Sequence, residues 1–414
     1  MTSIPLELWI AAGLALYMAW AIGANDVANA MGTSVGSGAL TVGGAVIVAA
    51  IFEFAGAFLA GGHVTDTVRK GMLDMSSLGR EQLIYGMMAS LASAGTLLIG
   101  ATRFGLPIST THAIVGAIVG FGAVAIGIDA VNWPKVLQIS LSWITSPLLA
   151  GVIAFAIFHL IRSTILNKSN PVHQIRKYGP AFFFFVFFII GLVTLFKGLK
   201  HINLDLDLME ALAGSVALGL IGSGLGAFFI RRVQIGEADP DHRFDQVERI
   251  FVVLQILTAC AIAFAHGSND VANAIGPLAA IVNAVENVDL TAKTPIAPWM
   301  LAIGGLGIVI GLATWGYRVM ETIGKKITEL TPSRGFAAQL AAASTIVLAS
   351  RLGIPISTTH TLVGAVLGVG LARGITALDL RVVGNILASW IATLPIAAAL
   401  SVFFYYFFKG LLTA

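Results

Sequence analysis

Apolar runs of about 20 residues, separated by short polar or turn segments, recur along the whole chain. A helix rises about 1.5 Å per residue and the hydrocarbon core of a bilayer is about 30 Å thick, so such runs are long enough to cross a membrane. The expected fold class is therefore an all-α polytopic membrane protein with about 12 helical segments. These segments are predicted near residues 6–31, 38–60, 82–101, 107–127, 135–160, 180–198, 208–230, 247–276, 298–318, 335–350, 354–371 and 382–408.

Two pairs of these segments are joined by only a few residues. The first pair is 82–101 with 107–127, and the second is 335–350 with 354–371. Short apolar segments joined in this way suit re-entrant hairpins, which enter a membrane protein and leave it on the same side, as well as two full crossings. We expect two re-entrant hairpins.

Two sequence motifs occur twice, with nearly the same spacing between copies. Gly23–Ala30 recurs as Gly267–Ala274, an offset of 244 residues, and Gly105–His112 recurs as Gly353–His360, an offset of 248 residues. The two halves of the chain are therefore predicted to be repeats of one unit. The expected division is a first repeat at 1–160, connecting spans with a cytoplasmic loop at 161–246, and a second repeat at 247–414.

The second repeat starts an odd number of crossings after the first, whether or not the hairpins are re-entrant. The repeats are therefore predicted to have inverted topology, an arrangement typical of secondary transporters. Lys and Arg accumulate in cytoplasmic loops, and placing both termini outside puts most of the 24 Lys and Arg residues on the inner side. We expect a multi-pass protein of the cell (inner) membrane with both termini outside.

Composition supports the membrane assignment. Of the 414 residues, 57% are hydrophobic and 11% are charged, about half the charged fraction usual in soluble domains. The net charge of +3 does not favour a nucleic-acid partner, and the single cysteine, Cys260, excludes an internal disulfide. The sequence has no zinc-protease, nucleotide-phosphate or hydrolase motif, so neither an enzyme nor a resident cofactor is expected.

The first motif places polar residues in a membrane span, where an Asp costs roughly 2.5–3.5 kcal/mol. Gly23 and Gly267 are expected to let each span unwind and free backbone groups. Carboxylate and amide oxygens suit a small cation such as sodium. The predicted sodium ligands are Asp26, Asn29, Asp270 and Asn273. The amides predicted to contact an anion are those of Asn25 and Asn269.

The second motif contains a proline that suits the first turn of a helix, Pro107 in one copy and Pro355 in the other. Hydroxyl groups follow at the positive end of that helix, where anions bind. The residues predicted to bind the anion are Ser109, Thr110, Thr111, Ser357, Thr358 and Thr359. Two roles are open for His112 and His360, which either donate to or gate the anion, or pack in the bundle interior.

Glu53 is an acid within an apolar segment, and we assign it a coupling role because intramembrane acids are generally functional. Its counterpart in the second repeat is apolar, so a symmetric role is not expected. An anion beside Asp26 and Asp270 would be repelled unless cations bind with it. The charges therefore predict a secondary transporter that couples an anion to a cation at a midplane site. An anion channel is disfavoured for the same reason.

The duplicated motifs Gly23–Ala30 and Pro107–His112, with their second copies, resemble those of the inorganic phosphate transporter family. The resemblance covers essentially both repeats, and it names phosphate as the anion. It implies import of inorganic phosphate by sodium symport, with sodium as the coupling ion. The alternative is a proton-coupled phosphate permease, or a sulfate permease, of the same fold. The lipid bilayer and a second copy of the chain, as a homodimer, are further expected partners.

Overall fold

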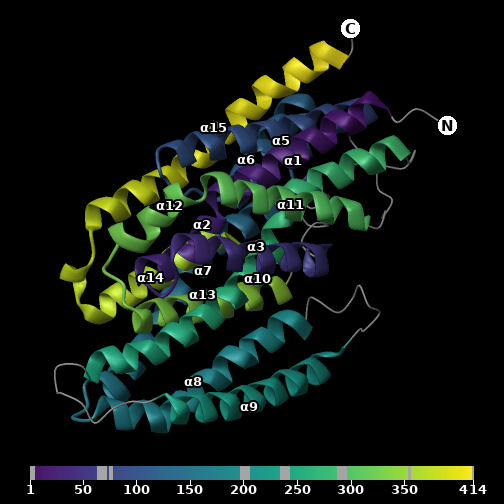
Figure 1. Ribbon diagram of the computed structural model, residues 1–414. Coiled ribbons are helices and arrows are strands. Elements are labelled where there is room, and N and C mark those ends of the chain that lie inside the picture. Colours follow the sequence, from purple (N-terminus) through teal and green to yellow (C-terminus); the bar gives the residue numbers. More distant parts are fainter. Residues whose placement is uncertain are drawn as a thin grey trace.

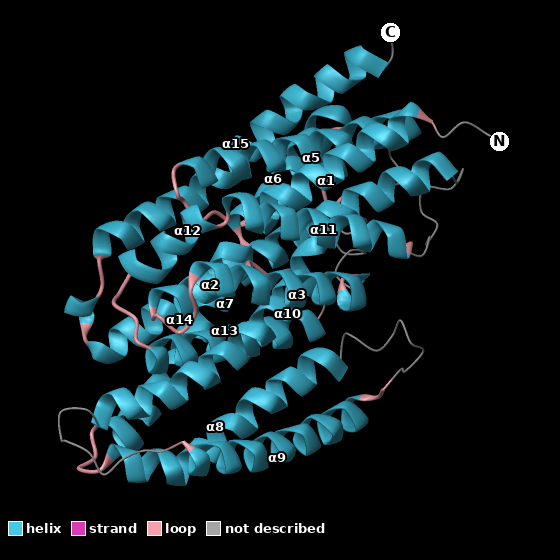
Figure 2. Cartoon of the chain, in the orientation of Figure 1, coloured by secondary structure: helices cyan, strands magenta, loops and turns pink. Residues whose placement is uncertain are grey.

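The computed structural model describes residues 5–62, 72–73, 78–195, 206–233, 243–286, 296–352 and 356–412, and nearly all of them are helical (Figure 2). Within this part of the chain, β structure is limited to one isolated bridge between Leu73 and Val131. Nine of the described helices are long and apolar enough to cross a membrane, judged by length and composition. The predicted all-helical membrane protein is confirmed at this level.

The described residues of the first half form six α-helices, which pack beside those of the second half (Figure 1). They are α1 (Leu6–Asn25), α2 (Val27–Gly36), α3 (Val42–Ala60), α5 (Arg80–Arg103), α6 (Thr110–Ala125) and α7 (Trp133–Ile161). A short 3-10 turn, η2 (Ile128–Ala130), precedes α7, and a π-helical turn, η3 (Arg162–Leu166), follows it.

The second half forms one very long helix and a set of shorter ones. The α-helices are α10 (Arg243–Glu286), α11 (Pro298–Trp315), α12 (Tyr317–Glu321), α13 (Pro332–Arg351), α14 (Thr358–Arg373) and α15 (Leu380–Leu412). A π-helical turn, η7 (Thr322–Lys326), follows α12, and a 3-10 turn, η8 (Ile375–Ala377), precedes α15.

Two helices between the halves, α8 (Pro171–Val193) and α9 (Leu208–Arg232), form a separate layer along one side of the molecule (Figure 1). They pack closely because glycines of α9 lie under phenylalanines of α8: Gly222 faces Phe187, and Gly226 faces Phe183. The start of α9 is fixed by Asp207 and Glu210, whose carboxylates accept from each other's backbone N–H.

The first motif lies at a helix break in the first half of the chain and within a continuous helix in the second half. In the first half the helix is interrupted at Asp26, which separates α1 from α2. In the second half α10 runs without interruption from Arg243 to Glu286, through Gly267 and Asp270. The expectation that both spans unwind is therefore wrong for the second copy. The role of Gly267 there is close packing, because a Cβ at this position would collide with the backbone of Glu53.

The long helix α10 carries a helical hairpin at each of its ends. Near its C-terminal end, Arg80 of α5 donates to Val285 O at 2.8 Å, and Gln82 donates to Ala125 O, at the end of α6, at 3.2 Å. Helices α5 and α6 therefore begin and end at the same side of the molecule.

The hairpin of α13 and α14 lies at the other end of α10. Ser333 N donates to Glu248 Oε2 at 2.8 Å, and Arg373, the last residue of α14, donates to Glu329 O at 3.0 Å. This hairpin therefore also begins and ends at one side, which is opposite to that of the first hairpin.

Glycine contacts fix how closely α3 and α10 approach each other. A Cβ at Gly56 would collide with the backbone of Phe264. We expect Gly56→Ala to lower the free energy of unfolding by about 1–3 kcal/mol, the usual cost of overpacking. Thermal unfolding of the detergent-solubilised protein measures the effect. Gly100→Ala is the matched control, because Gly100 is exposed on α5 with open space around it. Equal melting temperatures for both variants would contradict the packing argument.

Candidate functional site

The tips of the two hairpins meet inside the molecule. Thr111 Oγ1 donates to Ile356 O at 3.2 Å, and Thr359 Oγ1 lies 3.4 Å from Ile108 O, so each tip contacts the other in the same way. All four residues are buried. The N-termini of α6 and α14, which belong to different halves of the chain, are thereby brought to one place.

The two predicted serines begin these helices. Ser109 Oγ accepts from His112 N at 3.2 Å, and Ser357 Oγ accepts from His360 N at 3.1 Å. Each serine is therefore an N-cap, which satisfies one of the backbone donors that a helix leaves open at its start. In this structure the serines shape the two helix ends.

The two motif asparagines have different surroundings. Asn25 holds the first hairpin tip: its Nδ2 donates to Thr102 Oγ1 at 2.9 Å and to Leu106 O at 3.1 Å, and its Oδ1 accepts from Ile108 N at 3.2 Å. Asn269 donates to Asp270 Oδ1 at 3.3 Å, and its own Oδ1 has no hydrogen-bond partner although it is buried. The second copy thus leaves an amide oxygen available inside the site.

Asp26 accepts hydrogen bonds from both hairpin tips, and Asp270 accepts one from the second tip. Thr110 Oγ1 of the first tip and Thr359 Oγ1 of the second each donate to Asp26 at 2.6 Å. Asp270 accepts from Thr358 Oγ1 at 2.9 Å.

Side chains of α10 complete this arrangement. Asn273 Nδ2 donates to Asp270 Oδ1 at 3.1 Å. The remaining predicted ligand, Asn29, belongs to α2, but its side chain lies outside the described part of the chain.

A histidine that the sequence analysis did not select lies at the centre of the acids. His266 Nε2 is 3.1 Å from Asp270 Oδ2 and 3.7 Å from Asp26 Oδ1, and its Nδ1 is 3.0 Å from Glu53 Oε2. All four side chains are buried. The signal was present in the repeat, because His266 stands where the first copy of the motif has Ile22.

The contact between His266 and Glu53 is asymmetric between the two halves. Gly267, next to His266, packs on the backbone of Glu53, and Gly23, next to Ile22, packs on the backbone of Ile308 in the same way. Ile22 and Ile308 are both fully buried. Each of these two contacts joins one helix of each half: the α1–α11 contact has two apolar side chains where the α3–α10 contact has an acid and an imidazole. Ile308 of the second half thus corresponds to Glu53 of the first, which agrees with the predicted apolar counterpart of Glu53.

The cluster has the geometry to hold a small cation. One side-chain ligand atom from each of Asp26, His266 and Asp270 lies within 4.8 Å of the other two. The hydroxyl oxygens of Thr110, Thr358 and Thr359, which contact the same carboxylates, add neutral oxygens of the kind that hard cations bind. When a cation takes up the carboxylate charge, the hydroxyl hydrogens become available to an anion.

The two motif histidines, which lie directly after the hairpin tips, pack in a symmetric aromatic cluster. The ring of His112 lies 3.6 Å from that of Trp143, and the ring of His360 lies 3.5 Å from that of Trp390. Each Nδ1 approaches a backbone carbonyl of the opposite tryptophan, at 3.4 Å and 3.2 Å. Of the two roles left open by the sequence, this geometry favours packing. The four rings line an open, apolar cavity of about 980 Å³ between α7, α14 and α15.

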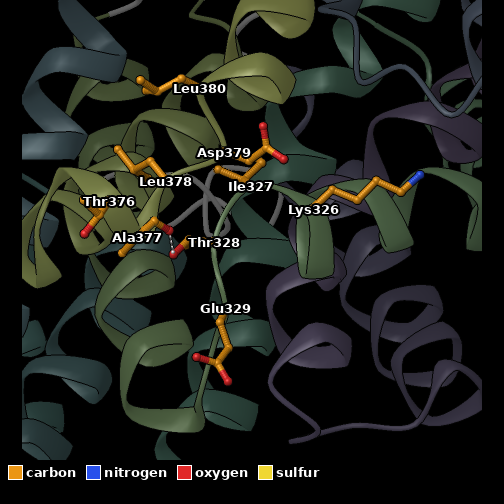
Figure 3. Close-up of a pocket in the computed structure, with 9 residues that line it drawn as sticks. All are labelled: Lys326, Ile327, Thr328, Glu329, Thr376, Ala377, Leu378, Asp379 and Leu380. Carbon is orange, nitrogen blue, oxygen red and sulfur yellow. Dashed lines mark hydrogen bonds between the residues drawn. The ribbon is translucent and has the colours of Figure 1, made fainter.

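A second cavity, of about 590 Å³, lies at the surface and is separate from the site. It is lined by residues 326–329 and 376–380 (Figure 3). The side chains of Lys326 and Glu329 extend away from each other, and Thr328 donates to Ala377 O at 2.8 Å. None of the residues predicted to bind an ion lines this cavity.

The pair of Glu53 and His266 is expected to be energetically coupled. Removing one partner of a buried ion pair costs about 3–5 kcal/mol, because the other is left unpaired. We therefore expect the double variant, Glu53→Ile with His266→Ile, to be more stable by at least about 1 kcal/mol than the sum of the two single effects. Thermal unfolding of the four proteins measures this coupling. Strict additivity would show that the two groups do not stabilise each other.

The chain is similar over most of its length to known phosphate transporters. The phosphate transporter family matches residues 22–401 of the chain. A putative phosphate permease of Haemophilus influenzae is 47% identical over 402 residues, which cover 96% of each chain. Inorganic phosphate transporter 2-1, chloroplastic, of Arabidopsis thaliana is 44% identical over 426 residues, which cover 96% of this chain and 71% of that protein.

A solved structure, described as the sodium-dependent phosphate transporter, is 42% identical to this chain and superposes with a TM-score of 0.89 over 98% of this chain and 99% of its own. These relatives are permeases and transporters, not enzymes. The extent of the match to the family, together with the identity to its permeases, confirms the resemblance seen in the two motifs. The chain belongs to the phosphate transporter family.

Proposed function

We propose that this protein imports inorganic phosphate by sodium symport. The observation that carries the proposal is the convergence of threonine hydroxyls from both hairpin tips on Asp26 and Asp270. In this proposal the sodium ions are bound by Asp26, Asp270, Asn29 and Asn273. The phosphate is bound by the threonine and serine hydroxyls of both tips and by the amides of Asn25 and Asn269. The similarity to a sodium-dependent phosphate transporter supports sodium as the coupling ion.

The fold proposed for this function is a pair of inverted repeats, 1–160 and 247–414, each with one re-entrant hairpin. Two observations support it: the hairpins start at opposite ends of α10, and each returns to the end at which it started. In addition, α10 ends at the side of the molecule at which α1 begins (Figure 1). Inverted repeats with a site between them suit alternating access, in which the site opens to one side of the membrane at a time.

Electrostatics favours a coupled mechanism. Asp26 and Asp270 are buried beside the hydroxyls that would hold the anion, so phosphate alone would enter a site that already holds negative charge. Two sodium ions would offset most of this charge, and the N-termini of α6 and α14 would add about half a positive charge each. Sodium would therefore raise the affinity for phosphate, and the reverse holds by linkage.

The same site is proposed to prefer phosphate over sulfate. Phosphate near neutral pH keeps at least one proton and can donate a hydrogen bond, whereas sulfate only accepts. The free Oδ1 of Asn269 is an acceptor that sulfate would leave unpaired. A site built to pair with a donor can reject an analogue that lacks it by on the order of 10⁴.

We place the transporter in the cell (inner) membrane with both termini outside, because that orientation puts most Lys and Arg residues on the cytoplasmic side. The exposed apolar side chains on α7 and α15 are suited to lipid or to a second copy of the chain. A homodimer remains part of the proposal.

The decisive experiment is uptake of labelled phosphate into proteoliposomes under an imposed sodium gradient and, separately, an imposed proton gradient. We expect the sodium gradient to drive accumulation and a hundredfold excess of sulfate to have little effect. Accumulation driven by the proton gradient alone would replace sodium with protons as the coupling ion. Equal competition by sulfate would overturn the assignment of phosphate as the preferred anion.

Asp26→Asn and Asp270→Asn are each expected to abolish sodium-driven uptake, because each removes an anionic oxygen ligand while keeping the size of the side chain. Asp379→Asn is the control: Asp379 lies outside the site, where it accepts from the backbone N–H groups of Arg381 and Val382. Initial uptake rates in proteoliposomes measure the effect. Full sodium-dependent uptake in both site variants would remove the carboxylates from the mechanism.

Thr359→Val is expected to weaken phosphate affinity by roughly tenfold, because it leaves a phosphate oxygen without a hydroxyl donor. Thr361→Val is the matched control on the same helix, since the Thr361 hydroxyl donates to the backbone oxygen of Ser357, the N-cap of its own helix. The apparent KM for phosphate measures the effect. An unchanged KM for Thr359→Val would place the anion elsewhere.

A further inference from the structure

Helix α2 links the site to the surface through a polar stripe. It has 10 residues, so it is about 15 Å long, half the thickness of the hydrocarbon core. Asp26, Thr33 and Ser37 recur at helical spacing along one face, with Ser34 beside them. The stripe begins at the buried Asp26 and ends at Ser37, which is partly exposed.

Two glutamines from neighbouring helices cover this stripe. Gln255 of α10 donates to Thr33 O at 3.1 Å and accepts from Ser37 Oγ at 2.7 Å. Gln339 of α13 donates to Ala30 O at 3.2 Å and to Ser34 Oγ at 2.7 Å. Both glutamines are fully buried. Gln255 therefore attaches α2 to α10, and Gln339 attaches it to α13. Each glutamine does so by one hydrogen bond with the backbone of α2 and one with a serine, Ser37 or Ser34.

The polar network is not fully satisfied. Thr33 Oγ1 is buried and has no hydrogen-bond partner, which is costly unless water or a solute reaches it in another state of the protein. An inert contact between helices gains nothing from such a group.

The other side of α2 packs closely on α12 and η7 through two glycines. A Cβ at Gly36 would collide with the backbone of Gly324, and one at Gly32 would contact Ile323 and Met320 O, so α2 packs on α12 and η7 by its backbone. The helix break at Asp26 frees the first residues of α2 from the hydrogen-bond pattern of α1. A short helix with a break at one end and smooth contacts along its length can shift as a unit.

We propose that α2, Gln255 and Gln339 form the closed path by which phosphate and sodium leave the site toward Ser37. The inference rests on the proposed function and names the pathway for that site. The path ends near the start of α10, the end that the proposed topology places in the cytoplasm. Opening it requires the two glutamines to release α2, and their amide groups then line the path with donors and acceptors.

Thiol accessibility tests the path directly. In a Cys260→Ala background, which removes the only native thiol, Ser34→Cys is compared with Ser93→Cys. Both serines are fully buried, but Ser93 lies between α5 and α15, where it donates to Ala397 O. Reconstituted vesicles receive the anionic reagent 2-sulfonatoethyl methanethiosulfonate on both sides. We expect Ser34→Cys to react at least tenfold faster than Ser93→Cys. If Ser34→Cys does not fold, Ser37→Cys, at the mouth of the path, replaces it as the labelling site.

Gln339→Ala tests the closure. This variant lacks the amide that holds α2 to α13, so the population of the open state increases. We expect the Ser34→Cys labelling rate to rise about tenfold, while that of Ser93→Cys is unchanged. Equal and slow labelling of Ser34→Cys and Ser93→Cys in proteins that accumulate phosphate would overturn the path. A parental Cys260→Ala protein that accumulates no phosphate would instead count against the proposed function, because the labelling comparison does not depend on uptake.

Discussion

Two buried carboxylates, Asp26 and Asp270, set the constraint on which the rest of the structure depends. A buried carboxylate is tolerated only when donors surround it, and inside a membrane water cannot supply them. Here the donors come from the N-terminal ends of α6 and α14, which also bring positive helix ends to the same place. These ends are buried because α6 and α14 begin inside the molecule, where the two hairpin tips contact each other. The short apolar segments, the N-cap serines and the contacts between tips all follow from that requirement.

The two halves share a framework but not the same charges. Both halves supply an aspartate, an N-cap serine and threonines at a hairpin tip, so this part of the site is nearly two-fold. The surrounding charges are not symmetric, because His266 and Glu53 face each other between α10 and α3, whereas the equivalent contact between α1 and α11 has Ile22 and Ile308. A symmetric version would bury a second acid and a second imidazole, at further desolvation cost. The two halves thus share the geometry of the site and differ in its charge.

The sequence alone predicted the features that depend on composition or on repetition. Long apolar runs predicted the helices, and the duplicated motifs indicated the family. The inverted topology and the ligand assignments remain predictions. His266 was missed because it is a single difference between two copies, and its importance depends on the neighbouring helix that brings Glu53 to it. Trp143 and Trp390 were missed for a related reason: they lie far from the motifs in sequence and contact His112 and His360 only in the fold. The continuous α10 could not be predicted either, because its Gly267 serves packing against α3.

The difference in helix continuity gives the two copies different mechanical properties. α10 carries Asp270, His266 and Asn273 on one unbroken helix, and both hairpins are attached near its ends, so these groups keep fixed relative positions. Asp26 lies instead at a break, between a helix packed tightly on α11 and a short helix held by two glutamines. In the proposed path, a shift of α2 would alter the surroundings of Asp26 and leave Asp270 and His266 in place on α10. A site with one rigid side and one adjustable side can open to solvent while much of its ion-binding geometry is preserved, which is what alternating access requires of a binding site.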